Sequence, residues 1–76
     1  MIQKLRRDLQ AKGWSVPEVY RVKEGDYWYW VVVAVGTSRD GGRVVIHGQG
    51  RKLEDAKLDF EQKAVRECAT PLPDWR

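Results

Sequence analysis

The most apolar stretch of the chain is residues 27–35, in which every side chain is aromatic, Val or Ala. Turn-forming residues enclose it, with Gly25-Asp26 before it and Gly36 after it. A short run that is rich in Val, Trp and Tyr and bounded by turn formers favours a β-strand over a helix. Alternate side chains of a strand point to opposite faces, and neither set here is polar. We therefore expect a central strand that is apolar on both faces.

Two more strands and two helices are predicted around this strand. Residues 18–23 alternate in polarity, and the tight connection Glu24-Gly25-Asp26 joins them to the apolar strand, which predicts a hairpin. Residues 43–47 follow a glycine-containing turn and predict a third strand. Apolar residues at helical spacing predict a short amphipathic helix before Gly13 and a longer helix from Leu53 to Cys68.

The predicted order is α-β-β-β-α, an α+β fold in which a three-stranded antiparallel sheet has two helices packed on one face. A chain of 76 residues has room for one domain, which we expect over residues 1–70, followed by a short tail at 71–76. The single Cys68 excludes an internal disulfide, so the apolar residues alone must form the core. Cys68 itself falls on the apolar side of the last helix and is expected to be a small buried residue.

The net charge of +3 is concentrated near the start of the chain. Four basic residues within residues 1–12 oppose the single Asp8, whereas residues 50–68 carry five charges of each sign. A basic first helix fits a polyanionic partner, and it equally fits a solvated helix face. Nothing after Met1 resembles a signal peptide, and no apolar run approaches the roughly 20 residues of a membrane span, so we expect a cytoplasmic protein without membrane contact.

Residues 48–57, with the sequence GQGRKLEDAK, resemble the junction between the third strand and the second helix of the double-stranded-RNA-binding domain. The likeness continues, in order along residues 4–68, at Asp8-Leu9, Lys12-Gly13-Trp14, Pro17, Tyr20, Phe60, Ala64 and Val65. Residues 50–56 also resemble antitoxins with a partial ribonuclease-H fold. The amphipathic helix before the first strand favours the RNA-binding family.

The resemblance implies a non-catalytic module that binds duplex RNA by its shape, through phosphates and 2′-hydroxyls. The contacts that it implies are Lys4 and Asp8 on the first helix and Arg51, Lys52 and Lys57 around the start of the second helix. The chain departs from the family here, because residues 53–55 are Leu, Glu and Asp where the family has positive charge. The first hairpin loop is also short and acidic.

The apolar second face of the sheet predicts an alternative function. Aligning Val35-Gly36 with the end of the family's second strand places Tyr29, Val31, Val33 and Val35 under the helices. It places Trp28, Trp30 and Val32 on the outer face. Trp is common at binding hot spots, and a contiguous exposed apolar patch usually marks an interface. We therefore expect these three residues to contact a protein partner or a second copy of the chain.

Other interpretations of this outer face remain open from the sequence. Trp75 and the Pro-containing tail could fold over it, or its aromatic rings could stack on unpaired bases. A protein partner would suit an inhibitor or regulator, including a phage-encoded one, since the domain is small.

Candidate catalytic groups are few. His47 is the only histidine and has no nucleophile near it in the sequence. Helix capping and solvation explain the carboxylates of Glu54-Asp55, Asp59 and Glu61 better than acid–base chemistry does. No constellation supports catalysis, so we expect a binding module without a cofactor, a metal or a small-molecule substrate.

Overall fold

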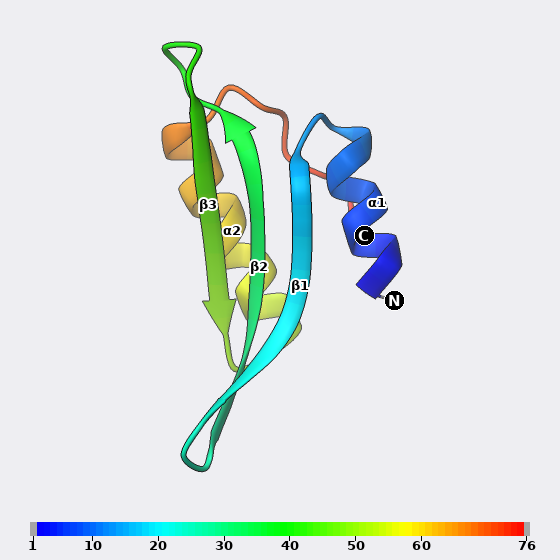
Figure 1. The fold of residues 1–76 in the computed structure, drawn as a ribbon, viewed down its shortest axis with the longest axis vertical. Helices are drawn as coiled ribbons and strands as arrows, with labels where there is room; N and C mark the ends of the chain where they lie inside the picture. Colours follow the sequence, from blue (N-terminus) through cyan, green and yellow to red (C-terminus); the bar gives the residue numbers. More distant parts are fainter. Residues whose placement is uncertain (1, 76) are drawn as a thin grey trace.

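The chain forms one antiparallel sheet with both helices on the same side (Figure 1). A computed structural model describes residues 2–75. In chain order the elements are α1 (Ile2–Ala11), β1 (Ser15–Glu24), β2 (Tyr27–Thr37), β3 (Arg43–Gly50) and α2 (Leu53–Glu67). The strands lie side by side in the order β1-β2-β3, and both neighbouring pairs are antiparallel. The predicted α+β fold with the order α-β-β-β-α is confirmed.

β1 and β2 form a long hairpin that extends beyond the ends of both helices (Figure 1). Gly25 turns the chain with a φ of 60°, a left-handed conformation that glycine adopts without steric cost. The other end of β1 carries a β-bulge between Ser15 and Glu18. Within the bulge the exposed Val16 has a φ of 48°, which is strained for a β-branched residue. The bulge explains why the alternation of β1 can be recognised only from Glu18 onward.

The two helices cover different strands of the same face. α1 lies against β1, whereas α2 packs on β3 and β2. α1 buries Leu5 and Leu9, and the buried apolar residues of α2 are Ala56, Phe60 and Ala64. These five residues meet in one core with buried side chains of all three strands.

α2 approaches β3 closely because β3 presents a glycine to it. A Cβ atom on Gly48 would lie 2.3 Å from the carbonyl oxygen of Ala56. Nearby, Asp59 Oδ2 accepts hydrogen bonds from the backbone N of Gln49 (2.9 Å) and from Lys63 Nζ (3.1 Å). Burial alone would raise the pKa of Asp59, but these hydrogen bonds outweigh it and the pKa lies below its usual value. The ionised carboxylate therefore joins α2 to the edge of β3.

The helices cover the opposite face of β2 from the one predicted. Val32 and Ala34 are completely buried in the core beneath the helices, and Trp30 packs against that core from the same face. Trp28 follows on this face toward the hairpin turn and is 46% exposed. Contrary to the prediction, Trp28, Trp30 and Val32 do not point away from the helices. Both sets of alternate residues in this strand are apolar, so periodicity does not distinguish its faces.

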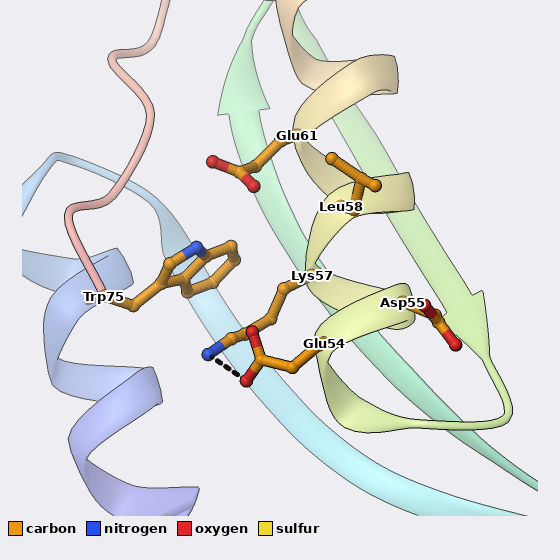
Figure 2. A pocket seen from close by; sticks show the side chains of 6 residues that line it. All are labelled: Glu54, Asp55, Lys57, Leu58, Glu61 and Trp75. Atoms are coloured by element: carbon orange, nitrogen blue, oxygen red, sulfur yellow. Dashed lines mark hydrogen bonds and ion pairs between the residues drawn. The ribbon is translucent and has the colours of Figure 1, made fainter.

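The C-terminal segment packs on the helix side of the sheet and belongs to the core. Trp75 is only 7% exposed, and its ring meets that of Phe60 edge-on, with centroids 5.9 Å apart. Figure 2 shows the Trp75 ring between α1 and α2. The indole N–H of Trp14 donates a hydrogen bond to the carbonyl oxygen of Pro71 at 2.8 Å. The core thus extends beyond residue 70, and this segment leaves the other face of the sheet uncovered.

Candidate binding surfaces

We call the side of the sheet opposite the helices the open face. In the described part of the chain no element packs over it. Because the even-numbered residues of β2 face the helices, its odd-numbered residues lie on the open face. The apolar side chains of the open face are Tyr20, Val22, Tyr27, Tyr29, Val31, Val33, Val35 and Val45.

Cross-strand pairing arranges the open face in rows. From β1 through β2 to β3, the rows are Ser15–Val35–Val45, Glu18–Val33–His47 and Tyr20–Val31–Gln49. Val31 on the central strand is buried among its neighbours, whereas Tyr20 and Val45 on the outer strands are largely exposed. The open face therefore has a continuous uncharged strip along β2, flanked by exposed apolar side chains.

Charged side chains of the open face lie on its outer strands and are separated by sign. β1 contributes the carboxylates of Glu18 and Glu24. β3 contributes Arg43 and His47, and Arg51 follows just after this strand. One long edge of the face is therefore acidic and the other carries the cations and the imidazole.

A shallow hollow lies at the hairpin end of the open face. It is lined by Glu24, Tyr27, Tyr29, Gln49 and Gly50. The Tyr29 hydroxyl donates a hydrogen bond to Glu24 Oε1 at 3.1 Å, and this bond raises the pKa of Tyr29. The guanidinium carbon of Arg51 lies 4.6 Å from the centroid of the Tyr27 ring. The hollow thus presents a carboxylate and a phenol at the end of the apolar strip, and the Arg51 guanidinium lies over one of its aromatic rings.

Lys57, a predicted phosphate contact, points into the domain between α2 and the C-terminal segment (Figure 2). It is 9% exposed, and its Nζ lies 3.1 Å from Glu54 Oε1 and 5.7 Å from the centroid of a Trp75 ring. The pocket beside it is also lined by Asp55 and Glu61, and the Asp55 carboxylate points away from Lys57 (Figure 2). A phosphate would meet the carboxylates of Glu54 and Glu61 on the same side of α2 as the Lys57 ammonium. Contrary to the prediction, Lys57 is not placed for such a contact.

The other predicted RNA contacts lie on two separate elements. Lys4 and Asp8 are one turn apart on α1 and form an ion pair of 2.9 Å. Arg51 and Lys52 are exposed between β3 and α2. The exposed Glu54-Asp55 pair follows in the first turn of α2. The start of α2 therefore presents both signs of charge.

A cluster of cations and aromatic rings on the helix side of the hairpin was not found by sequence reasoning. The guanidinium carbon of Arg21 lies 4.8 Å from the centroid of Trp28 and 5.6 Å from that of Trp30. Lys23 Nζ lies 5.7 Å from the Trp28 centroid. The pairing of Arg21 with Trp30 and of Lys23 with Trp28 produces this hairpin cluster. The correct register of the predicted hairpin would have indicated it.

Two side chains that often take part in catalysis, those of Cys68 and His47, lie on opposite sides of the sheet. Cys68 is buried, and burial, with a smaller effect of Glu67, raises the pKa of its thiol. The thiol is therefore protonated at neutral pH and is a poor nucleophile. His47 is exposed on the open face, in the row of Glu18 and Val33. It lines neither the hollow beside Tyr29 nor the pocket beside Lys57.

Within residues 2–75, no three His, Cys, Asp or Glu side chains are grouped so that they could hold a metal ion. None of the helices described is long and apolar enough to cross a membrane. No family model, no curated protein sequence and no solved structure matches this chain.

Proposed function

We propose that this domain is a non-catalytic protein-binding module that contacts its partner through the open face. The observation that carries the proposal is the uncovered apolar strip along β2, flanked by the exposed side chains of Tyr20 and Val45. Monomeric proteins seldom leave a contiguous apolar patch in water unless it is used for binding.

The distribution of charge on the open face supports the same function. Its centre is uncharged, and its ionisable groups lie on the outer strands. Protein interfaces have this anatomy, with charged residues depleted at the core and a polar rim. The helix side lacks this anatomy, because acidic residues of α2 line the pocket beside Lys57.

In-cell photocrosslinking tests this proposal even though the partner is unidentified. A photoreactive phenylalanine analogue replaces Tyr20, which is 44% exposed on the open face, or Leu58, which is 54% exposed on α2. We expect one discrete crosslinked product from position 20 and none from position 58. Position 58 is the matched control, since it is at least as accessible and lies on the other side of the domain. The absence of a discrete product at position 20, or the same product at both positions, would contradict the proposal.

A second candidate function, binding of duplex RNA, is favoured by the hairpin cluster. Arg21 and Lys23 lie on the same side of the sheet as α1, which carries the exposed Lys4 and Arg7. Cations on a hairpin and a helix of one side could contact phosphates at two places along a duplex. The carboxylates at the start of α2 oppose this function, so we rank it second.

Fluorescence anisotropy with a labelled RNA duplex of about 20 base pairs tests the second candidate, because affinity measured at two salt concentrations separates specific from purely ionic binding. Lys23→Glu should weaken binding about tenfold, and Arg43→Glu on the open face should leave it unchanged. Equal effects of the two substitutions, or equal affinity for DNA, would contradict duplex-RNA recognition by the helix side.

A further inference from the structure

We propose that the partner of the open face is a second copy of this chain, which forms a symmetric dimer with the two open faces in contact. This inference rests on the proposed function, since it names the occupant of the same surface. It is carried by the positions of the acidic and basic groups relative to the rows of the open face.

A twofold axis between two open faces, parallel to β2, places β1 of one copy over β3 of the other. The same rotation does not change the position of a row along β2, so each row lies over the equivalent row of the second copy. Val33, which is partly exposed, then meets Val33 of the second copy along the uncharged strip. Face-to-face sheets normally cross at about 30°, which keeps the central rows in contact and separates the ends.

This arrangement brings acidic side chains over basic ones because the two kinds lie on different outer strands. Glu18 and His47 occupy the two ends of one row, on either side of Val33. In the symmetric dimer, Glu18 of each copy lies over His47 of the other. Within one copy, Glu18 Oε1 lies 3.7 Å from the Arg6 guanidinium, and both side chains are exposed. An exposed ion pair of this kind contributes little stability, so the contact with His47 can replace it at small cost.

A second complementary pair lies at the hairpin end. Glu24 pairs with Tyr27 across the hairpin, and Arg51 lies over the Tyr27 ring from the β3 side. The two side chains therefore flank one row, again with the acid on the β1 side and the base on the β3 side. The same rotation brings Glu24 of one copy toward Arg51 of the other. A single symmetry operation thus satisfies both pairs.

The size of the open face indicates a dimer of moderate strength. Three strands spaced about 4.8 Å apart and about eight residues long present roughly 400 Å² of flat area per copy. Two copies, with the relief of their side chains, approach the lower end of the roughly 1,200–2,000 Å² that stable specific interfaces bury. We therefore expect a dissociation constant in the micromolar range rather than an obligate dimer.

Sedimentation equilibrium of the purified protein over a concentration series tests the dimer directly. Val33→Asp should weaken it at least about a hundredfold, because two carboxylates would face each other on the axis without partners. Val65→Asp, at an exposed position of α2, is the matched control and should leave the dissociation constant unchanged. Circular dichroism verifies that both variants remain folded. A dimer that Val33→Asp does not weaken would overturn the inference.

A mixing experiment tests the predicted pairing with substitutions that leave the apolar strip intact. Glu18→Lys alone and His47→Glu alone should each weaken the homodimer about tenfold, since every dimer contains the altered pair twice. An equal mixture of the two variants should recover wild-type affinity. In the mixed dimer the introduced ammonium of one variant meets the introduced carboxylate of the other, and the second pair is native. If the mixture is as weak as its components, the assigned pairing is wrong.

Sedimentation equilibrium and photocrosslinking at position 20 together separate the failure of this inference from the failure of the proposed function. A protein that stays monomeric at all concentrations, but whose position 20 crosslinks to one different protein, overturns the second copy and keeps the function of the open face. A monomer that yields no discrete crosslinked product from position 20 overturns both. A concentration-dependent dimer with a crosslink between two copies at position 20 supports both.

Discussion

Replacing Gly48 with alanine is expected to remove at least about 3 kcal/mol of stability, the upper end of the cost of overpacking a core. An added Cβ atom would lie 2.3 Å from the carbonyl oxygen of Ala56 and 2.4 Å from the backbone N of Phe60. Both atoms belong to the backbone of α2, so no side-chain rotation relieves the clash. The whole helix would have to move away from β3 and take Phe60 out of the core.

The size of this effect is large for a domain of this length. Natural proteins have about 0.05–0.15 kcal/mol of stability per residue, which gives roughly 4–11 kcal/mol here. Urea denaturation followed by circular dichroism measures the change. Gly42→Ala is the matched control, because an added Cβ there would be 3.4 Å from the nearest atom, an Asp40 carboxylate oxygen. If Gly48→Ala were as stable as Gly42→Ala, the close packing of α2 on β3 would be wrong.

Replacing Trp75 with alanine should cost about 3–5 kcal/mol, as removal of a buried aromatic ring usually does. The ring is 7% exposed, meets Phe60 edge-on and lies beside the Lys57 ammonium. Its loss would leave a cavity between α1 and α2 and would open the core to water there (Figure 2).

Trp28→Ala is the control for this substitution, because it removes the same ring from a position that is 46% exposed. We expect it to cost about 1 kcal/mol or less, as partly exposed substitutions usually do. Urea denaturation followed by circular dichroism avoids the change in tryptophan fluorescence that either substitution causes. Similar midpoints for the two variants would show that the C-terminal segment is not part of the core.

The elements of the fold could be predicted from the sequence because each has a clear local signal. The turn at Gly25 identifies the hairpin, and the helical spacing from Leu53 identifies α2. The facing of β2 has no local signal, since both of its faces are apolar. β3 contained a usable signal, because the polar residues Arg43, His47 and Gln49 alternate with residues that face the helices.

The candidate site was harder to predict because it depends on contacts distant in the sequence. Lys57 follows the buried Ala56 on α2, so its position on the helix leaves its exposure undecided. Its burial is completed by Trp75, eighteen residues later, which occupies the space beside it (Figure 2). The separation of acidic and basic edges on the open face likewise appears only once the register of all three strands is known.

We expect the open face, and not the helix side, to bind a second copy of the chain. The most direct test is a dilution series of a sample with isotope-labelled valine methyl groups, followed by nuclear magnetic resonance. Val45 on the open face and Val65 on α2 are each 53% exposed, so they differ only in the side of the domain that they report. We predict that the methyl signals of Val33 and Val45 shift with concentration while those of Val65 stay constant. Constant signals at Val33 and Val45, or shifts confined to Val65, would contradict the claim.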